Sequence, residues 1–177
     1  MYGESISRDT RDVILYDDLR LYLQKKYEAE HITEDEINRA ITRLETSDGG
    51  GVYAENVEAL RLLQEGFSLK RTNPKLPNLH IYPIDFTEVN NNELGKNNIF
   101  RFVNQFAIDG EHHRIPDGIV FVNGLPLVVL EFKNAIKQNT TIENAFKQLT
   151  VRYRRDIPKL FRYNAFVVIL SLIHISE

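Results

Sequence analysis

Residues 114–133 decide the fold, and they read RIPDGIVFVNGLPLVVLEFK. Two apolar runs meet at an Asn-Gly pair at positions 123–124, which is the strongest short-range signal for a β-hairpin. The carboxylate of Asp117 precedes the first run, while Glu131 and Lys133 close the second. Charged groups beside buried strands cost free energy unless they are paired or bind something. The stretch therefore predicts a hairpin that carries a functional site.

The register of this hairpin decides whether its two carboxylates lie on one face. Residues directly opposite each other in an antiparallel pair share a face of the sheet. A two-residue loop pairs Val122 with Leu125 and turns Glu131 away from the face of Asp117. A three-residue loop instead places Asp117 directly opposite Glu131. We therefore predict a loop of odd length, or a bulge with the same parity.

The residue types at this site favour a hard metal ion. The chain has no cysteine, and two carboxylates without clustered histidines make an oxygen-only site that suits Mg²⁺ or Mn²⁺ rather than zinc. Such an ion, held by Asp117 and Glu131 beside an amine, suits phosphodiester hydrolysis. The amine of Lys133 can orient the attacking water or stabilise the transition state. A salt bridge at the edge of a sheet is the structural alternative for this triplet.

The remaining pattern predicts an α/β fold in which helices flank a mixed sheet. Apolar spacing and two capping boxes indicate four helices, over 12–28, from 33 to 44, over 53–65 and after Thr140. The segment 80–86 reads as an edge strand. The segments 99–108 and 111–115, with the hairpin, predict an antiparallel three-strand meander. The apolar segment 164–170 follows a helix, so it is expected to join the sheet in parallel.

Composition and charge set the compartment and one candidate surface. The absence of cysteine suits a reducing, cytoplasmic compartment, and the first residues do not resemble a signal peptide. The net charge is −3, yet residues 133–162 contain eight lysines and arginines against two acidic residues. This run is either a solvated helix face or a surface that contacts phosphates.

The residues around the triplet resemble a known nuclease family. The spacing of Asp117 from the Glu-Phe-Lys at 131–133 resembles the PD-(D/E)xK signature. The stretches 104–106, 114–117, 121–134, 145–148 and 156–164 together resemble the N-terminal nuclease domain of type I restriction endonuclease subunit R. The resemblance extends from about Asp12 to Val168. It implies a restriction-endonuclease-like fold, with Asp117, Glu131 and the Phe132 carbonyl as Mg²⁺ ligands and Lys133 in catalysis.

The resemblance also implies residues that support the site or bind DNA, namely Gln148, Tyr153, Arg114 and Arg152. The family usually carries its glutamine and tyrosine four residues apart, whereas Tyr153 follows Gln148 by five. In an α-helix the extra residue turns the tyrosine by about 100° more, so a core position is the alternative for Tyr153. A structural ion pair is the alternative for Arg114. For Asp85, a structural role in a turn is favoured over a place near the site.

The resemblance implies a Mg²⁺-dependent DNA endonuclease, a type I site-specific deoxyribonuclease of a restriction-modification system. Its nuclease domain would cover residues 1–170, with a helical part at 12–66, a catalytic part at 80–170 and an atypical tail at 171–177. Its partners would be double-stranded DNA and the modification (methyltransferase) and specificity subunits. An ATP-dependent motor would follow, and a segment with another acidic residue would precede, so we expect a fragment truncated at both ends.

Two alternatives stay open beside this hypothesis. The first is a free-standing repair or resolvase-type nuclease, which would cut DNA with Mg²⁺ and without ATP. The second is a catalytically incomplete fragment that binds DNA or docks to a partner, and it would hold DNA with weak metal binding.

Overall fold

The computed structural model describes residues 1–87, 97–134 and 146–172, with side chains left undescribed at 133, 134, 171 and 172. The chain divides into two compact units. The sheet unit comprises Met1–Val13, Arg101–Phe121 and Pro126–Glu177. The helical unit comprises Ile14–Phe100 and Val122–Leu125. The predicted second capping box, at Thr140, lies outside the described residues.

The helical unit contains the three helices that the apolar spacing predicts. They are α1 (Tyr16–Lys26), α2 (Glu34–Glu45) and α3 (Val52–Glu65). The capping box is confirmed, because the Thr33 hydroxyl accepts the Glu36 N–H at 3.3 Å and the Glu36 carboxylate accepts the Thr33 N–H at 2.9 Å. Gly66 ends α3 with a positive φ of 70°. The apolar faces meet in a core that includes Leu19, Tyr22, Leu23, Ile37, Ala40, Leu44, Ala59 and Leu63.

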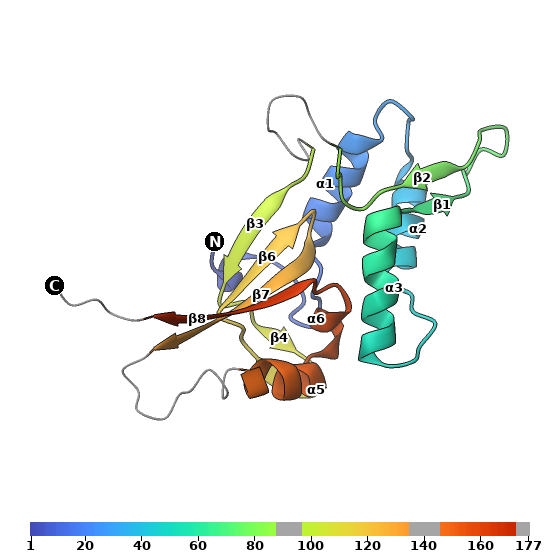
Figure 1. The fold of residues 1–177 in the computed structure, drawn as a ribbon. Helices are drawn as coiled ribbons and strands as arrows, with labels where there is room; N and C mark the ends of the chain where they lie inside the picture. Colours follow the sequence, from blue (N-terminus) through green and yellow to red (C-terminus); the bar gives the residue numbers. More distant parts are fainter. Residues whose placement is uncertain (88–96, 135–145, 173–177) are drawn as a thin grey trace. The chain divides into compact units, whose positions relative to one another are not determined.

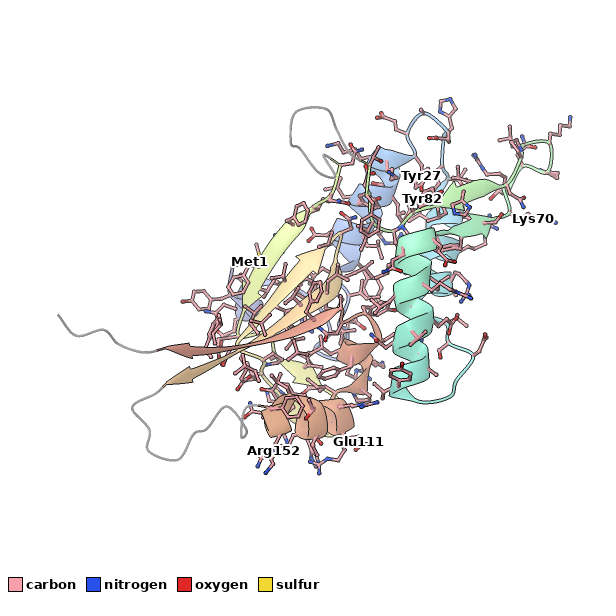
Figure 2. All side chains as sticks on the ribbon, viewed as in Figure 1. Met1, Tyr27, Lys70, Tyr82, Glu111 and Arg152 are labelled. Carbon is pink, nitrogen blue, oxygen red and sulfur yellow. The ribbon has the colours of Figure 1, made fainter. Side chains whose placement is uncertain are left out.

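A two-stranded antiparallel sheet completes the helical unit. It pairs β1 (Phe67–Leu69) with β2 (Leu79–Ile81), so the predicted edge strand is shorter than 80–86 and ends before Pro83. The main chain of Tyr82 is held by two tyrosines. Its N–H donates to the Tyr27 hydroxyl at 2.6 Å (Figure 2), and its carbonyl accepts the Tyr22 hydroxyl at 2.9 Å. None of the helices in the described part of the chain has the length and apolar character that a membrane crossing requires.

The sheet unit is built on four strands that run side by side (Figure 1). Their order is β3-β6-β7-β8, with bounds Phe100–Asn104, Gly118–Val122, Leu125–Asn134 and Phe166–Leu172. The prediction that the last strand joins in parallel is confirmed, because β8 pairs with β7 in parallel from Val128↔Phe166 to Asn134↔Leu172. Between them the chain forms a π-helical segment, η2 (Gln148–Tyr153), and two short helices, α5 (Arg154–Asp156) and α6 (Pro158–Arg162).

The predicted single strand over 99–108 is wrong, because the strand is interrupted at Gln105. This residue has a left-handed φ of 55°, which no β-strand residue adopts. The strand β3 therefore ends at Asn104. The residues beyond form β4 (Ile108–Asp109), which pairs antiparallel with β5 (His113–Arg114) in a separate two-stranded sheet. The small hairpin interrupts the predicted meander, although β3 and β6 are still neighbours.

Candidate functional site

The hairpin loop differs from the predicted odd length. The strands β6 and β7 are joined by the two residues Asn123 and Gly124, with φ of 52° and 79°, and positive φ at both positions is what a type I′ turn requires. Gly124 is needed here, because a Cβ would lie 2.2 Å from the Leu15 carbonyl oxygen. The predicted odd loop is wrong, while the alternative of a bulge with the same parity stays a prediction. Both rested on the assumption that Asp117 belongs to the paired ladder.

Asp117 instead lies in a bend just before β6, where ladder parity does not apply. Its carbonyl accepts the Gln105 N–H at 3.1 Å. Its carboxylate oxygen Oδ2 accepts the main-chain N–H of Phe132 at 2.7 Å. Phe132 follows Glu131 directly in β7, so the first carboxylate reaches the strand position adjacent to the second despite the even loop.

Glu131 is a buried carboxylate, with 4% of its surface exposed. It lies in β7 beside Ile169 of the parallel strand β8. Its oxygen Oε1 accepts a hydrogen bond from the Gln148 side-chain amide at 2.6 Å. Its oxygen Oε2 accepts a longer bond, of 3.4 Å, from the Tyr153 hydroxyl. Two side chains of one helical segment thus orient this carboxylate.

The π-helical turn explains how Tyr153 joins the site. A π-helix closes i→i+5 hydrogen bonds, so residues five apart come to the same side of its wider turn. The Gln148 amide nitrogen accordingly donates to the Tyr153 hydroxyl at 2.9 Å. The expectation from α-helical spacing, that the extra residue would turn the tyrosine away, does not hold in this segment. Single π-turns occur frequently at functional sites.

The hydroxyl of Tyr153 is kept neutral by its surroundings. Burial raises its pKa most, the negative charge of Glu131 raises it further, and the charge of Asp117 adds to this, so that the pKa reaches about 12. Both carboxylates therefore act on one buried phenol. A neutral hydroxyl donates a hydrogen bond to a carboxylate, which a phenolate cannot do.

Arg114 is occupied by a structural ion pair. Its guanidinium contacts the fully buried carboxylate of Asp156, with Nε at 2.7 Å and Nη2 at 2.5 Å from Oδ2. Arg155 contacts the same carboxylate at 2.6 Å. The bond from Arg155, outweighing burial and joined by Arg114, lowers the pKa of Asp156 to about 2. Arg114 therefore forms the structural ion pair that was the alternative to a DNA contact. This ion pair joins β5 to α5.

The chain matches the family model described as "Type I restriction enzyme R protein N terminus" over residues 2–174. The chain belongs to this family. It is 31% identical over 170 residues to the type I restriction enzyme HindI endonuclease subunit of Haemophilus influenzae, which covers 94% of this chain and 15% of that protein. It is 28% identical over 160 residues to the SsaAORF53P endonuclease subunit of Staphylococcus saprophyticus, covering 88% and 15% respectively. The chain thus spans about 15% of these relatives.

The oxygen donors at this site fit a hard divalent ion. The carboxylates of Asp117 and Glu131 and the main-chain carbonyl of Phe132 are all oxygen donors, the ligand type that Mg²⁺ and Mn²⁺ prefer. No group of three or more histidine, aspartate or glutamate side chains in the described ranges could hold a metal. An ion bound here would have two side-chain ligands and, as the resemblance implies, the main-chain carbonyl of Phe132. The Lys133 side chain lies outside the described residues, and its role stays a prediction.

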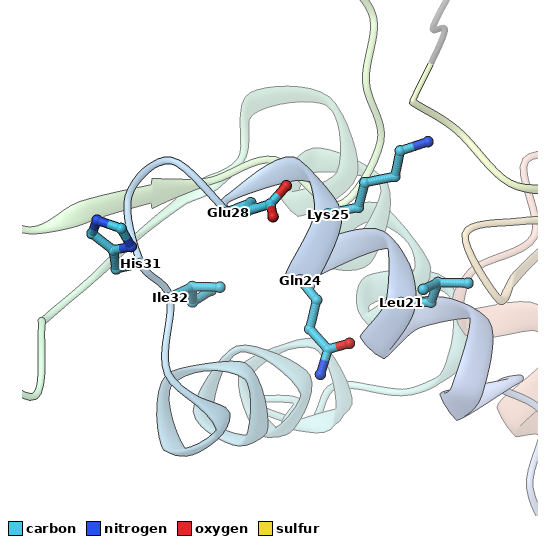
Figure 3. Close-up of a pocket in the computed structure, with 6 residues that line it drawn as sticks. All are labelled: Leu21, Gln24, Lys25, Glu28, His31 and Ile32. Carbon is cyan, nitrogen blue, oxygen red and sulfur yellow. The ribbon is translucent and has the colours of Figure 1, made fainter.

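Asp85 has the structural role that the sequence favours. Asp85 is 5% exposed and bonded to Lys26, Thr87 and Asn97. Burial alone would raise its pKa, but these bonds outweigh it and hold the pKa well below the usual range. A pocket in the helical unit is lined by Leu21, Gln24, Lys25, Glu28, His31 and Ile32, and neither Asp117 nor Glu131 lines it (Figure 3). The sequence reasoning missed how Gln105 holds Asp117, because no residue pattern marks its left-handed backbone.

Proposed function

We propose that this chain is the Mg²⁺-dependent DNA-cleaving domain of a type I restriction enzyme, acting as a site-specific endonuclease within a larger subunit. The observation that carries the proposal is the meeting of Asp117, Glu131 and Gln148 at one end of β7. Asp117 bonds the main chain next to Glu131 at 2.7 Å, and Gln148 holds Glu131 at 2.6 Å. Family membership and the names of the relatives point to the same activity.

Each residue has a distinct role in the proposed chemistry. Asp117, Glu131 and the Phe132 carbonyl would hold the ion, which when bound would supply a water of lowered pKa and positive charge at the phosphorus. Gln148 and the neutral Tyr153 keep the Glu131 carboxylate oriented, as partners of a metal ligand commonly do. Lys133 is proposed to orient the water or to stabilise the pentavalent transition state.

Arg152 and its basic neighbours are proposed to contact the DNA backbone. Arg152 is exposed on the outer side of the helical segment (Figure 2). Lys147 precedes it by five residues and is exposed too. The π-turn that aligns Gln148 with Tyr153 therefore favours one side for Lys147 and Arg152 as well. Two cations next to a carboxylate site suit a polyanion whose scissile phosphate lies at the metal.

The wider assembly follows from the same proposal. The partners are double-stranded DNA and the modification and specificity subunits, in the cytoplasm. The ATP-dependent motor would lie in the part of the subunit beyond this stretch, and ATP would bind there alone.

The test is DNA cleavage and ATP hydrolysis by the intact subunit in its complex, titrated with Mg²⁺ or Mn²⁺. We expect Lys133→Ala to lose cleavage and keep ATP hydrolysis, while the exposed lysine variant Lys70→Ala keeps both. Unchanged cleavage by Lys133→Ala would refute its role. Cleavage that needs no ATP would favour the free-standing nuclease. DNA retention without cleavage at any metal concentration would favour the incomplete docking fragment.

A further inference from the structure

The main chain of Asp117 is bonded to the main chain of Gln105. The Gln105 N–H donates to the Asp117 carbonyl at 3.1 Å, and the Asp117 carboxylate then reaches the Phe132 N–H at 2.7 Å. Gln105 has a φ of 55°, a left-handed conformation that is unfavourable for a residue with a Cβ. Such a conformation persists only where the surroundings hold it.

The segment 1–12 holds the main chain on both sides of Gln105. Before it, the Asn104 N–H donates to the Met1 carbonyl at 2.9 Å, and Tyr2 forms an isolated parallel β-bridge with Asn104. After it, the Asp109 N–H donates to the Thr10 carbonyl at 2.9 Å. The segment also contacts Gln105 itself, because a Cβ on Gly3 would lie 2.4 Å from the Gln105 carbonyl oxygen. The segment thus packs backbone to backbone against Gln105.

Arg8 anchors this segment through main-chain carbonyls. Its guanidinium donates to the carbonyls of Asp9 at 3.0 Å and Asp12 at 2.8 Å, within the segment. It also donates to the Ala107 carbonyl, and its central carbon lies 3.6 Å from the Phe106 ring centre. A planar guanidinium can bond several carbonyls and stack on a ring at once, whereas an ammonium cannot.

Phe106 connects Arg8 to the sheet by packing against strand β6. Its ring is fully buried and packs against Phe121 of β6 with ring centres 5.2 Å apart. The Arg8 guanidinium thus contacts the two residues that follow Gln105 in the sequence. The Met1 carbonyl bonds the residue that precedes Gln105. The Nε of Arg8 is buried and has no hydrogen-bond partner among the described residues, a cost that the other contacts offset.

We propose that residues 1–12 form a positioning element for the metal-binding carboxylate of Asp117, and that Arg8 is its key positioning residue. Arg8 acts through Phe106 and the left-handed Gln105, and it touches neither the ion nor the DNA. This inference rests on the proposed function, because it treats Asp117 as a metal ligand.

The first test measures Mn²⁺ binding to the intact subunit without nucleotide, by electron paramagnetic resonance. We expect Arg8→Gln to weaken the Asp117-dependent binding by about tenfold, the lower end of what loss of a metal ligand's partner costs. The control is Arg11→Gln, because the Arg11 guanidinium bonds only the surface carboxylate of Asp9 in the described structure, with 73% of its side chain exposed. Wild-type affinity in a folded Arg8→Gln subunit would overturn the proposal.

A second measurement separates this inference from the proposed function. Hydrogen exchange of the Phe132 amide reports its bond to the Asp117 carboxylate without any metal. Faster exchange in Arg8→Gln than in Arg11→Gln supports the positioning role even if the wild type fails to bind Mn²⁺, a failure that would refute the metal site alone. Equal exchange overturns the inference. If Arg8→Gln does not fold, Arg8→Lys is read by the same criteria.

Discussion

Gln148 and Tyr153 are five residues apart in sequence, and the amide nitrogen of the first donates to the hydroxyl of the second at 2.9 Å. Both side chains also bond Glu131. One π-helical turn makes this contact, and it gives the candidate metal ligand two orienting partners on a single helical segment.

Replacing Gln148 by a carboxylate should shift the pH dependence of cleavage. In Gln148→Glu a negative charge takes the place of the amide that lies 2.6 Å from Glu131. Like charges at this distance raise the pKa of a carboxyl, so the proposed metal binding by Glu131 would require a higher pH in this variant. We expect the acid limb of the cleavage profile to move upward. Gln148→Ala is the control, because it removes the bond without adding charge, and an equal profile in both variants would contradict the contact.

The phenol of Tyr153 should titrate near pH 12. Its pKa is raised by burial and by the charge of Glu131, so the ultraviolet difference between wild type and Tyr153→Phe should stay flat through pH 10 and rise towards pH 12. Because the folded pKa exceeds the usual value, its stabilising contribution is complete below pH 10 and is lost as the pH rises to about 12. A phenolate midpoint near 10 would show that Tyr153 is not buried beside the carboxylates.

The hairpin and this helical turn show what sequence could and could not predict. Local signals were sufficient for the three helices and for the capping box at Thr33, because periodicity and capping act within one element. The parallel pairing of β8 followed from the helix that separates it from β7 in the sequence. The register argument gave the wrong loop length, because Asp117 lies before the first residue of β6 and is not part of the paired strands. Tyr153 appeared out of phase because α-helical spacing was assumed, and a one-residue mismatch with a family motif is itself the signal for a π-turn. The chain around Gln105 contacts residues 1–12, which lie about 100 residues away in the sequence, so no local pattern encodes the split at Gln105.

The buried ion pair of Arg114 should govern acid stability. The pKa of Asp156 is lowered to about 2 by Arg155 and Arg114, so its contribution is present above the usual aspartate pKa and is lost as the pH falls to about 2. In urea unfolding at pH 7, Arg114→Ala and Asp156→Asn should both have a lower free energy of unfolding than the wild type. The difference between Asp156→Asn and the wild type should become smaller at pH 3. A deficit of Asp156→Asn that is constant with pH would contradict the charge of Asp156.

Arg114 and Arg152 should differ in their effect on DNA binding. Arg152 is proposed to contact a phosphate, so Arg152→Ala should reduce the slope of log affinity against log salt by about 0.9. Arg114→Ala should leave that slope unchanged, because its guanidinium is bonded to Asp156. Lys75→Ala, a charge removal at an exposed residue of the helical unit, serves as the control. Equal slopes for Arg152→Ala and Lys75→Ala would remove Arg152 from the DNA contact.

The most direct test of the metal site is Glu131→Gln, which keeps the shape of the side chain and removes its charge. Mn²⁺ binding and Mg²⁺-dependent DNA cleavage are measured on the same preparation of the intact subunit, with ATP hydrolysis as the check on its integrity. We predict that both binding and cleavage are lost while ATP hydrolysis continues. Binding and cleavage at wild-type levels in Glu131→Gln would contradict a metal-dependent nuclease site at the end of β7.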